Sequence, residues 1–246
     1  MVNQESENVS VIDGNNNTAV ATIGLGGWQE CVGVNSATNR IYVSNDNSNN
    51  VSVINGNTNT VIATIGVGAN PRGVGVNSVT NRVYVANQGS QEVSVISGLS
   101  NVVIATIPSS SNPWDVGVNT TTNRIYVSNQ GSNNVSVIDG NSNTILTPIG
   151  VGDNPRGLDV NSATNRIYVA NWVSNNVSVI DGNSNTILTS IEVGSGPFDL
   201  GVNSITNGIY VANQGSNNVS VIDGNTNTVI ATIAVGSKPN SIGMNP

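Results

Sequence analysis

The stretch from Arg124 to Asn165 contains the pattern that decides the fold. It reads Arg-Ile-Tyr-Val-Ser-Asn (124–129), a polar loop, Val-Ser-Val-Ile-Asp-Gly (135–140), an Asn/Ser turn, Ile-Leu-Thr-Pro-Ile (145–149) and a Gly/Pro loop before Gly-Leu-Asp-Val-Asn (157–161). The Val-Ser-Val-Ile core recurs every 42 residues without insertion or deletion, starting at Val9, Val51, Val93, Val135, Val177 and Val219. A fixed repeat of this length predicts structural units that each bury their apolar faces against their neighbours.

Each repeat holds four expected strands, which we name A to D. Strand A is the Val-Gly-Val type (32–34, 74–76, 116–118, 158–160, 200–202, 242–244), B is centred on a tyrosine, C is Val-Ser-Val-Ile, and D is Val-Ile-Ala-Thr-Ile (61–65) and its equivalents. β-Branched residues favour strands, and the Asn-Ser-Ala-Thr-Asn (35–39) and Asp-Gly-Asn-Ser-Asn (139–143) segments suit tight turns. No segment shows a helical period, so we expect an all-β fold.

Four antiparallel strands in each 42-residue unit are typical of a β-propeller blade. Pro148 cannot donate to a strand ladder, which predicts that D is a free outer edge. Glycine at the middle of strand A, as in Gly33 and Gly117, suits crowding at an inner edge. The five tyrosines of strand B repeat in register, so we interpret them as core residues.

The chain is six residues shorter than six full repeats, because the equivalents of Ile205–Tyr210 are missing from the last one. We therefore predict a single domain over residues 1–246, folded as a six-bladed β-propeller. Its last blade would be shared between residues 1–23 and 239–246, and pairing of the N-terminal strands with a C-terminal inner strand would close the ring.

The composition excludes several classes of function. The 246 residues include 7 Lys and Arg, no histidine and one cysteine, Cys31, with a net charge of −7. Scattered basic residues do not make a nucleic-acid-binding face, and no apolar run is long enough for membrane insertion. A lone cysteine excludes an internal disulfide, and the missing histidines remove the commonest general base. The start of the sequence shows neither a charged leader nor a hydrophobic signal core.

Several motifs give the chain a family resemblance. Tyr-Val-Ser-Asn (126–129), Val-Ser-Val-Ile-Asp (135–139) and Asn-Pro-Arg-Gly (154–157) resemble the repeats of the YVTN family of β-propellers, and the resemblance covers nearly the whole chain. That family is similar to surface-layer and cell-surface proteins of archaea and bacteria. The resemblance implies an extracellular location and a non-enzymatic binding or scaffolding role.

The repeats differ from one another mainly in the D–A and B–C loops, which the antiparallel order predicts on one rim. All three tryptophans and the only phenylalanine fall there. Exposed aromatic side chains beside Arg, Asp and Asn residues are typical of a ligand-binding face, although they could instead fold back and plug the channel mouth. The candidate ligand-binding residues are Trp28, Glu30, Arg72, Trp114, Asp115, Arg156, Trp172, Phe198 and Asp199.

Asp159 replaces the glycine in the middle of an A strand, and Asp115 and Asp199 lie nearby on the same rim. Converging carboxylates could bind Ca²⁺, but the acidic residues lack the spacing of a known loop. We therefore expect Asp159 to be a solvated carboxylate, and we assign no metal or other cofactor.

The first functional hypothesis is a non-enzymatic extracellular binding or adhesion module for a glycan, a peptide or a partner protein at the cell surface. A structural subunit of a surface layer or filament, assembled by self-association, is the alternative. A metal-dependent propeller lyase is the weakest hypothesis, because propeller lyases of similar architecture rely on histidine and this chain has none.

Overall fold

The computed structural model describes residues 1–244, and these residues form only strands, turns and loops. They build six antiparallel sheets within two compact units, one of residues 1–113 and one that begins at Trp114, and each unit is described by itself. The prediction of an all-β chain is confirmed for the described residues. In that range no helix is long and apolar enough to span a membrane.

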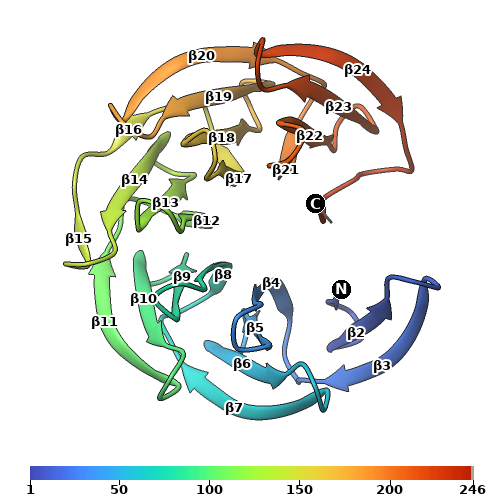
Figure 1. The fold of residues 1–246 in the computed structure, drawn as a ribbon, viewed down its shortest axis with the longest axis vertical. Coiled ribbons are helices and arrows are strands. Elements are labelled where there is room, and N and C mark those ends of the chain that lie inside the picture. The colour runs from blue at the N-terminus through green and yellow to red at the C-terminus, as the bar shows by residue number, and fades with distance from the viewer. Residues whose placement is uncertain (245–246) are drawn as a thin grey trace. The chain divides into compact units, whose positions relative to one another are not determined.

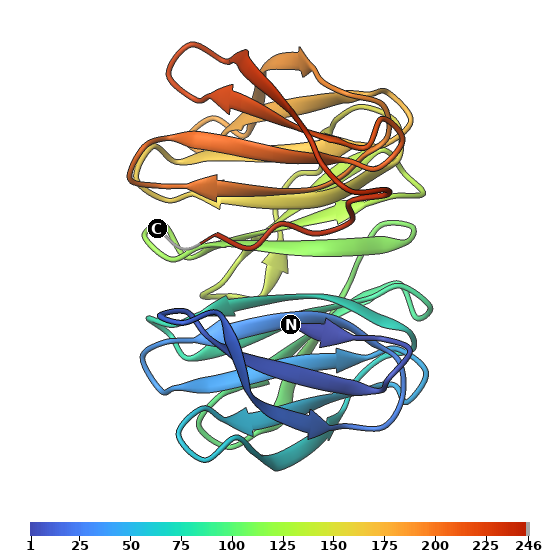
Figure 2. The same cartoon turned by 90° about the vertical axis from the view of Figure 1, so that its right-hand side faces the viewer.

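The first unit contains one sheet of three strands and two sheets of four (Figure 1). Figure 2 shows its strands running back and forth between two sets of turns. Their bounds are β1 (Val2–Asn3), β2 (Asn8–Asp13) and β3 (Thr18–Gly24); β4 (Gln29–Asn35), β5 (Arg40–Asn45), β6 (Asn50–Asn55) and β7 (Thr60–Gly66); and β8 (Pro71–Asn77), β9 (Arg82–Asn87), β10 (Glu92–Ser97) and β11 (Val102–Pro108).

The second unit contains one sheet of five strands and two of four. The bounds are β12 (Pro113–Asn119), β13 (Arg124–Asn129), β14 (Asn134–Asp139), β15 (Thr144–Ile145) and β16 (Ile149–Gly150); β17 (Pro155–Asn161), β18 (Arg166–Asn171), β19 (Asn176–Asp181) and β20 (Thr186–Glu192); and β21 (Pro197–Asn203), β22 (Gly208–Asn213), β23 (Asn218–Asp223) and β24 (Thr228–Ala234).

The order A–B–C–D predicted for each repeat is confirmed in five of the six sheets. Strands A and D are the two edges of each, as in β4-β5-β6-β7. Strand D of the sheet that contains Pro148 is divided into β15 and β16, which both pair with β14, and Pro148 lies in the break between them.

One predicted strand is wrong. Ile242–Met244 were expected to form strand A of the last repeat, but they join no sheet, because no strand B pairs with them. The Ile242 N–H donates instead to the Asp199 carboxylate at 2.9 Å. Residues 245–246, the end of the predicted closing segment 239–246, lie outside the described residues. Closure of all six sheets into one ring, and the single domain it implies, stay predictions.

The strand B tyrosines form the centre of the packing between adjacent sheets. Tyr42 of β5 is fully buried and packs against Val74 and Val83 of the next sheet. Tyr126 and Tyr168 pack against the equivalent residues of the sheets that follow them. The interpretation of these tyrosines as core residues is confirmed for four of them, whereas Tyr210 is only partly buried.

Asparagine is abundant because the turns require backbone conformations that it tolerates. The A–B turns end on asparagines with positive φ of 47–54°, and the C–D turns do the same with φ of 53–57°. Asparagine adopts this left-handed region more readily than most residues. The residues are Asn39, Asn81, Asn123, Asn165 and Asn207 in the first set, and Asn17, Asn59, Asn101, Asn143, Asn185 and Asn227 in the second.

Two side chains of strand B connect it to other strands. The last asparagine is buried and donates to strand C, as in Asn129 Nδ2 to Asn134 Oδ1 at 2.8 Å and to Ser136 Oγ at 2.9 Å. The first arginine binds the C–D turn of the next repeat, as in Arg166 Nη1 to the Gly224 carbonyl at 2.7 Å. Arg166 thus ties strand B to the turn of the neighbouring sheet.

Strand A glycines allow adjacent sheets to approach closely. A Cβ added at Gly33 would lie 2.8 Å from Val76 Cγ2 and 3.0 Å from the Val74 carbonyl oxygen. At Gly117 it would lie 2.4 Å from Leu158 Cδ1. These distances are shorter than van der Waals contact, so the sequence expectation of a crowded strand A is confirmed within each unit.

Candidate ligand-binding site

Arg156 is the centre of an aromatic cluster in the second unit. Trp114, Arg156 and Phe198 occupy the same position of three successive A strands, β12, β17 and β21, 42 residues apart. Trp172 joins them from the loop that follows β18. We call these four residues the aromatic–arginine cluster.

The guanidinium of Arg156 contacts the faces of all three rings. Its Cζ lies 4.2 Å from the ring centroid of Trp172, 4.6 Å from that of Phe198 and 5.1 Å from that of Trp114. Trp114 and Phe198 also contact each other edge to face, with centroids 6.1 Å apart and planes at 80°. Each ring contact is within the distance at which cation–π attraction is significant.

Polar residues fix the arginine in place. Arg156 Nε donates to Asn154 Oδ1 at 3.2 Å, and Gln130 Nε2 donates to the same oxygen at 2.8 Å. The main chain is held too, because Ser128 Oγ donates to the Arg156 carbonyl at 2.6 Å. A guanidinium held on several sides keeps a defined orientation, which lowers the entropy cost of binding a ligand.

The cluster is only partly covered by the rest of the unit. Trp114, Arg156, Trp172 and Phe198 are all half-buried. The Trp172 indole N–H is buried and has no acceptor among the described residues. The rings thus pack on Arg156 and still keep part of their surface accessible. The choice between the two sequence-based alternatives, a ligand-binding face and a plug of the channel mouth, stays a prediction.

The first unit has a different arrangement at the equivalent position. Glu30 and Arg72 correspond to Trp114 and Arg156, and they form an ion pair of 2.6 Å. Arg72 Nε also donates to Gln88 Oε1 at 3.1 Å, and Asp46 lies 4.0 Å from its Nη2. Burial raises the pKa of Glu30, and Arg72 partly offsets that effect. Trp28, which directly precedes β4, is 47% exposed and is the first unit's tryptophan.

Three aspartates connect an A strand to the segment one repeat later in the second unit. Asp115 and Asp159 bridge neighbouring A strands, accepting from Leu158 at 3.0 Å and from Val202 at 2.9 Å, and Asp199 accepts from Ile242 of the C-terminal segment at 2.9 Å. Each also accepts one N–H from its own strand. The expectation that Asp159 is a solvated carboxylate is wrong, because its oxygens bind two backbone N–H groups.

Desolvation governs the titration of these carboxyls. Burial raises the pKa of Asp159 from 3.8 to about 6 and that of Asp199 to about 7, against the opposing effect of the N–H donors. The charge of Asp115 raises both values further, and burial raises the pKa of Asp115 itself. No group of three or more potential metal ligands is found among the described residues.

The structure thus brings Trp114, Arg156, Trp172 and Phe198 together and gives Asp115 and Asp199 bridging contacts next to them. Glu30 and Arg72 form a separate pair within the first unit. Sequence reasoning missed Asn154 and Gln130 as the residues that orient Arg156. Asn154 belongs to the Asn-Pro-Arg-Gly motif, so its position two residues before the arginine was the available signal.

Comparison with known proteins identifies the fold. Kuenenia stuttgartiensis hydrazine synthase matches with a TM-score of 0.86 and 19% identity, over 97% of this chain and 84% of that chain. A functionally unknown protein from Desulfotomaculum acetoxidans DSM 771 matches with a TM-score of 0.83 and 16% identity, over 97% and 81%. At such identities the likeness shows the fold alone, which is that of a β-propeller. No protein-family model and no curated protein matches the sequence, so the YVTN resemblance is not confirmed.

Proposed function

We propose that the chain is a non-enzymatic binding module whose aromatic–arginine cluster contacts the ligand. The observation that carries the proposal is the Arg156 guanidinium in contact with three half-buried aromatic rings. Tryptophan and arginine are the residues most enriched at binding hot spots, because they combine apolar area with directional donors.

The ligand class follows from the same chemistry. Partly exposed ring faces bind flat apolar surfaces, and a fixed guanidinium adds directional polar contacts. A glycan, a peptide or a loop of a partner protein at the cell surface offers both. We place the protein outside the cell because of the YVTN resemblance, and assign it no cofactor. Self-association into a surface layer or filament is the alternative, which light scattering at high concentration tests.

The first testable prediction concerns the cluster itself. Trp172→Ala or Phe198→Ala should weaken binding at least tenfold, because each removes ring area from the contact surface. Arg156→Lys should also weaken it, since lysine keeps the charge but loses the planar stack. Binding is measured on glycan and peptide arrays, and the affinity for the strongest hit is then determined by calorimetry.

Leu99→Ala is the matched control, because Leu99 is 85% exposed in a C–D turn of the first unit and is not a member of the cluster. Its affinity should equal that of the parent protein, and all variants should melt at a similar temperature. Unchanged affinity in the cluster variants would contradict the proposal. Unfolding of these variants would also contradict it, because the cluster would then have a structural role.

A further inference from the structure

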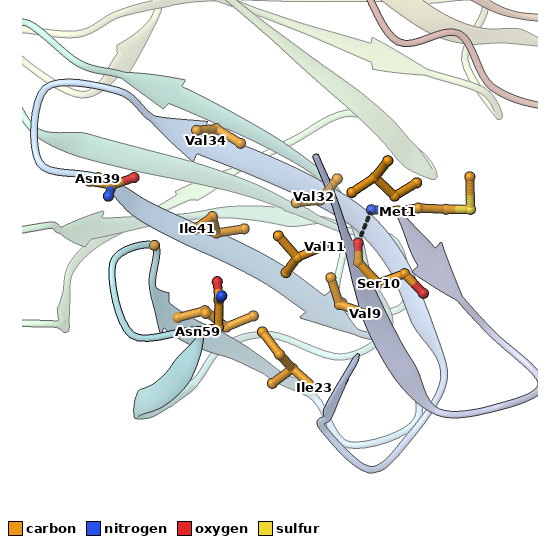
Figure 3. A pocket seen from close by; sticks show the side chains of 13 residues that line it. Met1, Val9, Ser10, Val11, Ile23, Val32, Val34, Asn39, Ile41 and Asn59 are labelled. Atoms are coloured by element: carbon orange, nitrogen blue, oxygen red, sulfur yellow. Dashed lines mark hydrogen bonds between the residues drawn. The ribbon is translucent and has the colours of Figure 1, made fainter. Parts of the chain in front are cut away.

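An apolar groove lies between the first two sheets of the first unit (Figure 3). Its volume is about 350 Å³, and it is lined from β2 and β3 by Val9, Val11 and Ile23 and from β4 and β5 by Val32, Val34 and Ile41. Figure 3 shows the labelled side chains of the two sheets on either side of this space. All residues that line the groove belong to the first unit.

The repeat provides internal controls for the surface of this groove. Val32 is 37% exposed, whereas its equivalents Val74 and Leu158 are 6% and 4% exposed. Val11 and Ile41 are half-buried, although their equivalents in the other sheets are buried. In the other sheets, the same residue types are thus covered by a side chain that the described first sheet does not contain.

The covering component in the other sheets is the tyrosine of strand B. Tyr42 packs on Val74, Val83 and Ile96. Those residues are the equivalents, one repeat later, of Val32, Ile41 and Ile54, which line the groove. Tyr126 and Tyr168 make the same contacts in their own sheets. The groove therefore corresponds to the position that a strand B tyrosine of the first sheet would fill.

The backbone at the groove also lacks its partner strand. In the first sheet, strand B is β1, which has two residues and pairs Val2 with Val9 and Asn3 with Asn8. The Met1 and Ser10 main chains exchange two hydrogen bonds of 2.9 Å. Beyond Ser10, within residues 1–244, this edge of β2 has no paired strand at Val11–Asp13. In a complete sheet the equivalents of these residues pair with Arg-Ile-Tyr, as in β5 with β6.

We propose that this groove binds an extended polypeptide segment from outside residues 1–246 with the pattern Arg-Ile-Tyr. The segment adds to β2 as an antiparallel strand in line with β1, and its tyrosine ring fills the space between Val11, Val32 and Ile41. Main-chain hydrogen bonds supply affinity in such strand addition, and the side-chain pocket supplies specificity. A second copy of this chain is a poor donor, because Tyr42, Tyr84, Tyr126 and Tyr168 are fully buried in their own sheets.

The test uses the full chain and an amidated synthetic hexapeptide, Ala-Thr-Asn-Arg-Ile-Tyr, which copies residues 37–42 and 163–168. Amidation removes the attraction between a peptide carboxylate and the ammonium of Met1. Calorimetry should show one peptide per chain, and saturating peptide should raise Tm by about 2–4 °C. A control peptide with serine in place of tyrosine should bind on the order of tenfold more weakly or not at all.

Val32→Ser in the protein should weaken binding of the parent peptide by a similar factor. Val79→Ser, at a 75% exposed turn position, should leave the affinity for this peptide unchanged. No binding of the parent peptide at millimolar concentration, or equal binding of both peptides, would overturn the proposal. Concentration-dependent dimerisation that the peptide abolishes would assign the groove to a second copy and would also overturn the proposal.

Discussion

The three bridging aspartates show how single residues determine the response of this protein to pH. Asp159 and Asp199 have a raised carboxyl pKa, about 6 and about 7, because burial disfavours their charged form. A folded-state pKa above the unfolded one means that the folded chain binds more protons. The stability this provides is complete below pH 3.8 and is lost as the pH rises through about 6 and about 7.

We predict that the carboxyls of Asp159 and Asp199 lower the free energy of unfolding as the pH rises from 4 to 7. For Asp159 alone, whose pKa is raised by about two units, the decrease is at most about 3 kcal/mol. Asp159→Asn should flatten this dependence, because the amide does not titrate. Urea titrations at several pH values measure it.

Asp139→Asn serves as the control for this experiment. Backbone N–H groups of the turn lower the pKa of the exposed Asp139, so its contribution is lost only at acid pH, below the range tested. That variant should keep the parent slope from pH 5 to pH 7. An equal slope in the parent and in Asp159→Asn would show that the bridging carboxyl is not the cause.

At the scale of one strand, the glycines of strand A allow the closest approach between sheets. Gly33→Ala should lower the free energy of unfolding by about 1–3 kcal/mol, because the new Cβ meets two valine methyl groups and the Val74 carbonyl, which is part of the backbone. Gly24→Ala is the matched control, since no atom lies within 4 Å of its added Cβ. Urea titration compares the two, and equal stability would contradict close packing at β4 and β8.

Pro148 permits a second prediction at the element scale. Pro148→Ser reproduces the residue at the equivalent position of β20, Ser190, which pairs with Ser178. The new N–H should point to the outer edge of the sheet, because Ser10, the equivalent of Ser136, directs both its N–H and its C=O to strand B. The substitution should therefore change the free energy of unfolding by less than about 0.5 kcal/mol. Urea titration measures this change, and a gain of about 1 kcal/mol would show that Pro148 breaks a ladder hydrogen bond.

The same comparison of elements shows what the sequence could predict. Strand order, turn positions and the tyrosine core could be predicted because the repeat has no insertions. Side chains alternate between the two faces of a strand, and the turns recur at fixed positions, so few strand registers are possible. The role of Asp159 did not follow, because its partner N–H belongs to Val202, 43 residues away. The stacking of Arg156 was equally hidden, since it depends on the distance between adjacent sheets. The prediction of a strand at Ile242–Met244 was wrong because a repeat pattern does not reveal that the partner strand B is missing.

At the scale of the whole molecule, the repeat predicts one cooperative domain. In repeat folds each sheet is stabilised mainly by its neighbours, so six coupled sheets should unfold together. Tryptophans report on both units: a Trp114→Phe, Trp172→Phe variant leaves Trp28 as the probe of residues 1–113, and Trp28→Phe leaves the probes of the second unit. The two variants should give the same midpoint in urea when fluorescence and circular dichroism are followed. Circular dichroism of each variant controls for a change in stability caused by the substitution itself. Distinct fluorescence midpoints, each with a matching step in circular dichroism, would show that the two units fold independently and would refute the single domain.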